Sequence, residues 1–400
     1  MIPSTRVPER APPIYLDHNA TTPVDPRVRD AMLPWLGERF GNAASRSHRF
    51  GWEAEEAVEQ ARARVAALLG ADPREIVFTS GATESNNLAL KGLAEAREGG
   101  GGHVVSSPTE HPSVLDTLAW LQTRGVAVTL LPVDRHGRVS PGDVEAALRA
   151  DTFLVTLMAA QNEIGTLHPV REVGAVCARR GVLFHCDATQ ALGKVPFDAA
   201  RDGVHLASLT AHKMYGPKGC GALYVRRRDP EVRLRIQMHG GGHERGLRSG
   251  TLNVPGIVGL GAAAELGARE REEEAARCRA LRDALLARLR AALPDLALNG
   301  HPTERLPGNL HVSIPGVESE ALMLALPELA VSSGAACSSG SLEPSPTLRA
   351  IGLPPDLARC PVRFGIGRST SAAEVERAAA LVAEAAVRLR AGARPRTRAR

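Results

Sequence analysis

The sequence predicts an α/β fold with a large domain and a smaller α/β domain. The large domain is expected to contain a mostly parallel, seven-stranded sheet covered by helices. From about residue 75, short β-rich runs alternate with helical patterns, and several runs are apolar on both parities, as strands buried on both faces must be. Near residue 260 this alternation stops, and a long amphipathic, charge-rich helical pattern begins.

The alternating region supplies the strands and helices of the large domain. Seven runs have strand character, at residues 75–81, 103–108, 126–133, 152–158, 182–187, 204–210 and 221–227. Helical patterns lie between them at 83–96, 113–124 and 171–180. A further helix is expected to start after Ser140, because a capping serine there precedes a proline in the first turn.

The smaller domain is expected on both sides of the large one in the sequence. The pattern at 262–293 is typical of a helix that leaves one domain and enters another, and 309–316 and 361–367 resemble strands of a second sheet. The predicted division is 24–262 for the large domain and 1–23 with 263–390 for the small one, followed by a disordered basic tail at 391–400.

The net charge of +5 comes from the C-terminal end of the chain. Subtracting six arginines from +5 leaves −1 for the rest; they are Arg388, Arg390, Arg394, Arg396, Arg398 and Arg400. No aromatic platform or basic stripe accompanies them, so we expect a solvated tail and no stable nucleic-acid binding.

Nothing in the sequence indicates a membrane or secreted protein. No stretch approaches the roughly 18 uninterrupted apolar residues of a membrane helix. The first 13 residues lack the apolar core of a secretory signal. The six cysteines form no CxxC pair and no Cys/His metal-ligand spacing, so we expect free thiols, no metal site and a cytoplasmic location.

Candidate functional residues gather where the predicted strands end, because open α/β sheets bind ligands beyond the carboxyl ends of their strands. Small residues at 80–83 begin a helix and would expose backbone N–H groups to an anion, although tight packing alone also favours them. The loop at 109–113 carries His111, and the loop at 160–165 carries a cluster of amide and carboxylate groups.

Two later strands end in an acid and a lysine. Asp187 closes the strand at 182–187, and Lys213 follows the strand at 204–210. If the two strands are neighbours, the side chains lie at the same rim of the sheet. A carboxylate for a pyridinium nitrogen and an amine for an aldehyde are what pyridoxal 5′-phosphate (PLP) requires. A simple Asp–Lys ion pair is the alternative.

Seven motifs in this order resemble those of the cysteine desulfurases, in the NifS/IscS branch of the fold-type I PLP enzymes. They are TSGATESNN, EHPSVL, AQNEIG, HCDATQ, TAHKMYGPKG, HGGGHERGLRSGT and SSGAACSS. The resemblance runs from about residue 15 to about residue 368. It implies a PLP-dependent transferase fold and an enzyme that takes sulfur from L-cysteine and leaves L-alanine.

The resemblance also implies roles around the cofactor ring. Lys213 would form the covalent link to PLP, and Asp187 would pair with the ring nitrogen. His111 would stack on the ring and carry a proton, which its ordinary pKa near ~6.5 suits. Gln190 would donate to the phenolic oxygen, with Asn162 close to cofactor and substrate.

Other motif positions would hold the phosphate and the substrate. The phosphate ligands within one chain would be Ala82, Thr83, Thr210 and His212. Thr251 would reach the phosphate of the other subunit of a homodimer. Arg363 would clamp the substrate carboxylate through two parallel hydrogen bonds, a geometry that lysine cannot copy.

Cys337 lies in a Gly/Ser-rich stretch and would accept the sulfur as a persulfide. The persulfide would then pass to an acceptor protein such as an Fe–S scaffold, or to thio-cofactor or tRNA biosynthesis. The nearest alternative is a β-eliminating enzyme of the same fold, such as a selenocysteine lyase, and Cys337 distinguishes the two. A fold relative without activity is a further alternative, against which intact Lys213 and Cys337 argue.

Overall fold

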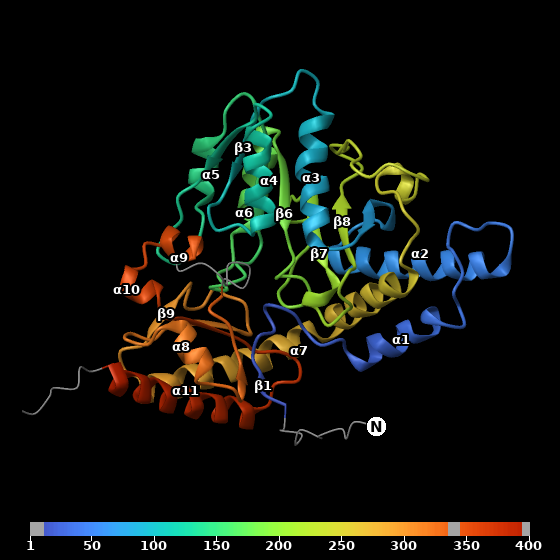
Figure 1. The fold of residues 1–400 in the computed structure, drawn as a ribbon. Helices are drawn as coiled ribbons and strands as arrows, with labels where there is room; N and C mark the ends of the chain where they lie inside the picture. Colours follow the sequence, from blue (N-terminus) through green and yellow to red (C-terminus); the bar gives the residue numbers. More distant parts are fainter. Residues whose placement is uncertain (1–11, 335–344, 394–400) are drawn as a thin grey trace, which may run out of the picture.

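The large sheet has seven strands, in the order β2-β8-β7-β6-β5-β3-β4 (Figure 1). The structure is a computed structural model that describes residues 12–334 and 345–393. β8 is antiparallel to both of its neighbours, and the other pairs are parallel. The predicted fold class and all seven strands are therefore confirmed, at β2 (Ile76–Thr79), β3 (His103–Ser106), β4 (Ala127–Leu130), β5 (Thr152–Met158), β6 (Leu183–Asp187), β7 (Leu206–Thr210) and β8 (Gly221–Val225).

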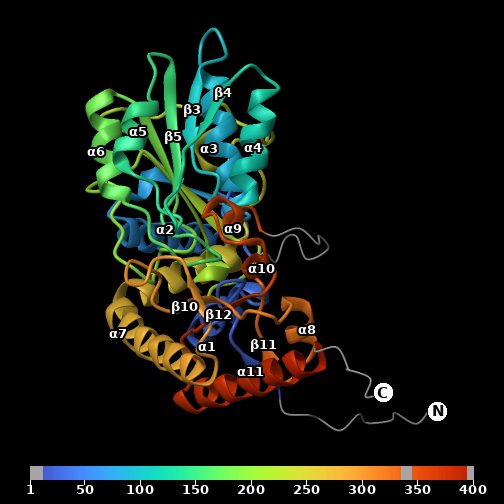
Figure 2. The same cartoon turned by 90° about the vertical axis from the view of Figure 1, so that its left-hand side faces the viewer.

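Helices cover both faces of this sheet (Figure 2). One face carries α3 (Ala82–Ala96) and α4 (Pro112–Gln122), and the other carries α6 (Val170–Arg180) beside α5 (Pro141–Ala147). Successive strand residues point into different cores, since Val77 packs under α3 and α4 whereas Phe78 packs on the opposite side. Strands buried on both faces explain the apolar runs in the sequence.

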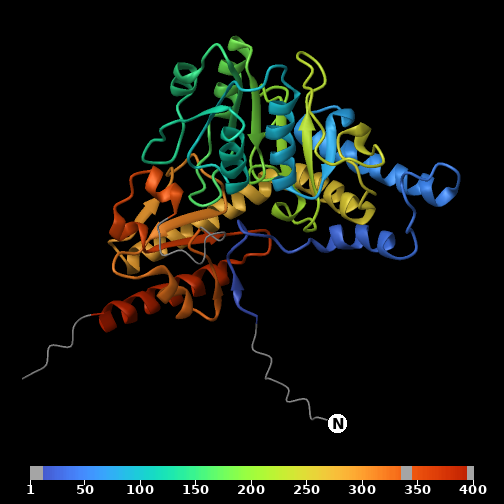
Figure 3. The same ribbon diagram turned by 45° about the horizontal axis from the view of Figure 1, so that its top comes forward.

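A 39-residue helix, α7 (Val254–Ala292), runs from the underside of the large lobe into the small lobe (Figure 3). It packs on α1 (Pro26–Leu36) and α2 (Arg49–Leu69) at one end and on α11 (Ala372–Ala393) at the other. Its first part is buried almost all round, so the amphipathic pattern at 262–293 reveals only its later turns. Gly261 allows the close crossing with α2, because a Cβ there would lie 2.6 Å from the Cα of Ala61.

The smaller lobe is built on a three-stranded antiparallel sheet, β12-β10-β9. The N-terminal strand β1 pairs in parallel with β11 and so joins this lobe. The division at residues 23/24 and 262/263 stays a prediction, with 262 falling inside α7. The elements are β1 (Ile14–Tyr15), β9 (Ala297–Asn299), β10 (Asn309–Ser313), α8 (Ser319–Leu324), β11 (Leu329–Ala330), α9 (Pro346–Ala350), α10 (Pro355–Ala358) and β12 (Pro361–Gly365).

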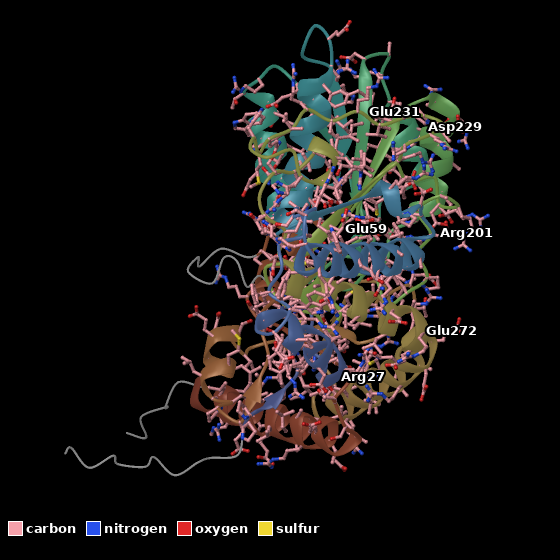
Figure 4. The ribbon with its side chains drawn as sticks, turned by 90° about the vertical axis from the view of Figure 1, so that its right-hand side faces the viewer. Arg27, Glu59, Arg201, Asp229, Glu231 and Glu272 are labelled. Atoms are coloured by element: carbon pink, nitrogen blue, oxygen red, sulfur yellow. The ribbon has the colours of Figure 1, made fainter. Side chains whose placement is uncertain are left out.

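Short 3₁₀ turns and ion pairs complete the framework. The turns are η1 (Pro73–Glu75), η2 (Ala211–Lys213) and η3 (Glu244–Gly246). Figure 4 shows Arg27 of α1 beside α7, where its Nη1 donates to Glu270 Oε1 at 2.6 Å. In the described part of the chain, no helix combines the length and apolar character needed to cross a membrane. Residues 394–400 of the expected tail lie outside the described residues.

Candidate active site

The carboxyl ends of β6 and β7 bring the predicted acid and lysine to one edge of the sheet. Asp187 is the last residue of β6, which pairs in parallel with β7 and places Asp187 opposite Ser208. η2 follows β7 directly and ends at Lys213. The two strands are thus neighbours, and among the described residues no ion pair joins Asp187 to Lys213 or to any other cation.

Lys213 is held by the N-terminal segment of the chain. Its Nζ donates to the carbonyl oxygens of Asn19 and Ala20, both at 2.6 Å. Burial is the largest cause that lowers the pKa of this amine to about 7, and the positive charges of Lys194 and Arg363 contribute to the same shift. A large fraction of the amine is therefore neutral near pH 7, the form that attacks an aldehyde.

A chain of hydrogen bonds joins Asp187 to His111. Asn86, fully buried on α3, donates from Nδ2 to Asp187 Oδ2 and to Ser113 Oγ, both at 2.9 Å. Ser113 Oγ lies 2.8 Å from His111 Nδ1, and Thr189 N–H donates to Asp187 Oδ1 at 3.0 Å. Because Asn86 already donates to it, the Ser113 hydroxyl is free to donate to the imidazole.

His111 lies at the N-cap of α4, where its Nδ1 also accepts from Ser113 N–H at 3.1 Å. Burial lowers the pKa of His111, so the imidazole is neutral at pH 7. With Nδ1 acting as an acceptor, the proton of the neutral ring lies on Nε2. His111 can thus exchange a proton through Nε2.

The start of α3 is a candidate anion site. The N-cap Gly81 has no side chain to satisfy the first N–H groups of the helix, so those of Ala82 and Thr83 are open to an anion. A Cβ on Gly81 would lie 3.7 Å from Thr210 Oγ1, which places that hydroxyl beside the same turn. Burial lowers the pKa of nearby His212 to about 4, and its Nδ1 lies 3.1 Å from Thr21 Oγ1.

Gln190 belongs to a group of three polar side chains next to Lys213. Its Oε1 accepts from Asn19 Nδ2 and from Lys194 Nζ, both at 3.2 Å. Its Nε2 donates to the Asn19 carbonyl oxygen at 2.9 Å, and Lys213 donates to that same oxygen. Gln190 and Lys213 therefore share an acceptor.

Arg363, on β12, is the buried cation that faces this edge from the small lobe. Its side chain is 2% exposed, and its Nη2 lies 2.7 Å from Asp17 Oδ1. Nη1 donates to the carbonyl oxygens of Asn162 at 2.9 Å and Gly334 at 3.2 Å. Its Nε has no partner among the described residues and remains available to a carboxylate.

The described residues on either side of 335–344 lie beside Glu163. A Cβ on Gly334 would lie 3.4 Å from the Cβ of Glu163, and Ser345 Oγ donates to Glu163 Oε2 at 2.6 Å. His311 Nε2 lies 3.4 Å from the Ser333 carbonyl oxygen. The predicted nucleophile Cys337 belongs to 335–344 and lies outside the described residues.

Thr251 is exposed and has no recorded contact with Lys213 in the described chain. The segment before it is fixed by two ion pairs. Glu244 meets Arg62 through two 2.8 Å contacts, and Arg248 Nε lies 2.8 Å from Glu84 Oε1 at the start of α3. The structure therefore brings together every predicted site residue that it describes except Thr251.

Comparison with known proteins agrees with this geometry. Residues 14–378 match the family model described as aminotransferase class-V. A cysteine desulfurase IscS of Anaeromyxobacter sp. (strain Fw109-5) is 58% identical over 378 residues, which cover 94% of this chain and 93% of the relative. The chain belongs to the cysteine desulfurase family, and its cofactor is PLP. A cysteine desulfurase of Rattus norvegicus is 50% identical over 94% of this chain and 84% of its own.

Solved structures give the same family. A NifS-like protein superimposes with a TM-score of 0.87 at 38% identity, covering 93% of this chain and 98% of its own. DndA from Streptomyces lividans has a TM-score of 0.75 at 40% identity, covering 86% and 97%. The chain is thus a cysteine desulfurase in both sequence and fold.

The described residues fit PLP. Its phosphate, ring nitrogen and aldehyde need an anion site, a carboxylate and an amine. The uncapped start of α3, the buried Asp187 without a cationic partner, and the amine of Lys213 supply these three groups at one edge of the sheet. The donor set therefore suits the family's cofactor.

Three site residues were missed from the sequence. Asn86 lies inside a helix and Asp17 in the N-terminal segment, and neither shows a pattern that indicates its partner. Lys194 had one signal, because it is one of only four lysines in a chain with 49 basic residues. A lysine retained in an arginine-rich sequence, seven residues after the end of a predicted strand at Asp187, was the usable hint.

Proposed function

We propose that this cysteine desulfurase removes sulfur from L-cysteine at the edge formed by β6, β7 and β12, and holds it as a persulfide on Cys337. The observation that carries the assignment is that Lys213, whose amine has a pKa of about 7, lies at the same edge of the sheet as the buried carboxylate of Asp187. Mass balance is complete, since L-cysteine and the Cys337 thiol give L-alanine and the Cys337 persulfide.

The residues proposed to hold PLP surround this pair. Lys213 would form its covalent link, Asp187 would face the ring nitrogen, and Gln190 would donate from Nε2 to the phenolic oxygen. The phosphate would meet the first N–H groups of α3 with the side chains of Thr83, Thr210 and His212. When bound, PLP supplies an electrophilic carbon and a ring that accepts electrons.

Two side chains are proposed to handle the substrate. Arg363 would bind the substrate carboxylate through Nε, which is unpaired among the described residues, and through Nη2, which also contacts Asp17. These two contacts would keep the amino acid oriented. His111 would stack on the ring and move a proton at Nε2, because Nδ1 is occupied by Ser113. Asn162 would lie beside the carboxylate, since its own carbonyl oxygen already binds Arg363.

Cys337 is proposed to receive the sulfur because the described residues on either side of 335–344 lie next to Arg363 and Glu163. Gly334 is hydrogen bonded to Arg363, and Ser345 to Glu163. Cys337 is only three residues after Gly334, so its thiol is proposed to act on the substrate sulfur near Arg363. A lyase would have no use for that thiol.

The proposed assembly is a homodimer in which Thr251 reaches the PLP phosphate of the other subunit. An exposed aromatic pair supports an interface: Phe40, on the α1–α2 connection, is 72% exposed, Phe50, in the first turn of α2, is 50% exposed, and their rings stack at 5.2 Å. We further propose a cytoplasmic location, because the five described cysteines are free thiols, and an Fe–S scaffold or another sulfur acceptor as partner.

The test compares the PLP-loaded wild type with Cys337→Ala and Lys213→Ala, each treated with L-cysteine without added reductant. Alanine and protein-bound sulfane sulfur are quantified together with the cofactor absorbance. We expect alanine and persulfide in equal amounts from the wild type, no persulfide from Cys337→Ala, and no normal cofactor absorbance from Lys213→Ala. Pyruvate and free sulfide from both the wild type and Cys337→Ala would identify a β-eliminating lyase.

A further inference from the structure

Lys194 is a buried lysine next to the proposed cofactor site that the catalytic assignment leaves without a role. It follows β6 in the turn that contains Gln190, and its Nζ donates to Gln190 Oε1 at 3.2 Å. It lies on the wall of a cavity of about 30 Å³ between the two lobes. The other titratable groups lining this cavity are His18, Tyr215, Glu274 and Cys278.

The contact fixes which way the Gln190 amide points. An ammonium group only donates, so the atom facing Lys194 has to be the carbonyl Oε1. Asn19 Nδ2 donates to the same Oε1 at 3.2 Å, which adds a second reason for this orientation. The donating Nε2 is then directed to the opposite side, where it meets the Asn19 carbonyl oxygen that also binds Lys213.

The same lysine places a second positive charge beside Lys213. Burial lowers the pKa of Lys194, Glu274 on α7 partly opposes this shift, and the net pKa is about 8. Near pH 7 Lys194 is thus mostly charged, and its charge is the largest cause after burial that lowers the pKa of Lys213. The charged and titratable groups facing this pair of amines are Asp17, Asp187, Glu274, Cys278, Arg363, His18, His111 and His212.

We propose that Lys194 is a positioning residue for the cofactor-binding amine: it orients the Gln190 amide, and its positive charge acts on Lys213, to which it is joined through Gln190 and the Asn19 carbonyl oxygen. The inference rests on the proposed role of Lys213 in binding PLP. It separates two contributions, a hydrogen bond that any suitable donor can supply and a charge that only a cation can supply.

Three substitutions distinguish the two contributions. Lys194→Arg keeps charge and donor, Lys194→Gln keeps only a donor, and Lys194→Met keeps neither. Lys91→Met is the matched control. Lys91 lies on α3, its Nζ is 4.6 Å from the centre of the Trp120 ring on α4, and it takes no part in the contacts around Lys213.

The first measurement is the rate at which full-length, PLP-free protein captures added PLP, followed by absorbance from pH 5.5 to 9. Capture requires the neutral amine, so the wild-type rate rises with pH through a midpoint near 7. Loss of a neighbouring positive charge favours protonated Lys213, so the midpoint should move up by ~1 pH unit in Lys194→Gln and Lys194→Met. Lys194→Arg and Lys91→Met should keep the wild-type midpoint.

The second measurement is the rate of PLP loss on dialysis, which reports the Gln190 contact without any catalytic turnover. Lys194→Met should lose PLP about tenfold faster than Lys194→Gln, since only the latter still donates to Gln190 Oε1. If Lys194→Met does not fold, Lys194→Gln still tests the charge.

An unmoved midpoint in Lys194→Gln overturns the charge role, and equal PLP loss in the Gln and Met variants overturns the orienting role. Lys213→Ala separates this result from a failure of the proposed function. If Lys213→Ala still acquires the normal cofactor absorbance, the assignment of Lys213 itself is wrong. If it does not, an unmoved midpoint contradicts only the inference about Lys194.

Discussion

Replacing Arg363 by lysine should weaken use of L-cysteine while leaving the cofactor in place. The guanidinium makes three contacts, at 2.7 Å to Asp17, 2.9 Å to Asn162 and 3.2 Å to Gly334, and still has a free Nε. A lysine keeps the charge but offers one nitrogen, which cannot serve Asp17 and both oxygens of a carboxylate. Losing one charge-assisted hydrogen bond costs about 1.5–3 kcal/mol.

That free energy corresponds to a loss of roughly 10- to 150-fold in kcat/KM. The assay measures initial rates of alanine formation over a range of L-cysteine concentrations, for the wild type and Arg363→Lys. Because the carboxylate is bound both before and during the reaction, we expect most of the loss in KM. The absorbance of bound PLP should stay the same, since the positive charge beside Lys213 is preserved.

Arg282→Lys is the matched control, because Arg282 is also buried, at 6% exposure, and lies on α7 with Asp283 as its partner. It should keep kcat/KM within about threefold of the wild type. A similarly small change in Arg363→Lys, or an equal loss in both variants, would refute the assignment of Arg363 as the carboxylate clamp.

Three further predictions follow from buried polar contacts. Glu244→Ala leaves the buried Arg62 without its two-point partner and should destabilise the fold by about 3–5 kcal/mol, seen as a lower Tm than in Glu59→Ala. Burial raises the pKa of Glu110, so this side chain stabilises the fold most below about pH 4.5, and its contribution declines as the pH rises. The Tm of Glu110→Gln should therefore rise relative to that of the wild type between about pH 5 and pH 8. A difference in Tm that stays constant over this range would contradict the prediction. Asn86→Leu removes the amide that donates to both Asp187 and Ser113, the hydrogen-bond partner of His111. This variant should lose PLP on dialysis about tenfold faster than the wild type, and an unchanged rate would exclude a role of Asn86 in cofactor retention.

Much of the fold was predictable because burial constrains which residue types occur at neighbouring positions of the sequence. Strands covered on both faces must be apolar on both parities, and this pattern located all seven strands of the large sheet. The start of α7 was placed eight residues too late, at 262 and not at 254, because its first turns are buried all round and lack an amphipathic face. The pairing of β1 with β11 joins two segments more than 300 residues apart in the sequence, and no local sequence pattern predicts such a contact.

The site was predictable to the extent that its residues lie at strand ends. Asp187 and Lys213 could be placed together because consecutive strands of an α/β sheet are often neighbours. Their supporting residues could not, because Asn19 reaches Lys213 across 194 positions of sequence and Asn86 reaches Asp187 across 101. Which side chain satisfies a buried polar group depends on packing in three dimensions, and a single sequence does not record it.

Arg363 connects the parts of the site that the chain builds separately. One guanidinium contacts Asp17 of the N-terminal segment, Asn162 in the loop after β5, and Gly334, the last described residue before Cys337. A carboxylate that binds to Nε and Nη2 has to share Nη2 with Asp17, so substrate binding changes the balance of hydrogen bonds around this side chain. Because Ser332 Oγ also donates to Asp17 at 3.2 Å, that change reaches the base of the Cys337 segment through two residues of the same network. Arg363, the proposed substrate clamp, and Ser332 therefore share Asp17 as their acceptor, so we expect a substitution of Asp17 to affect both.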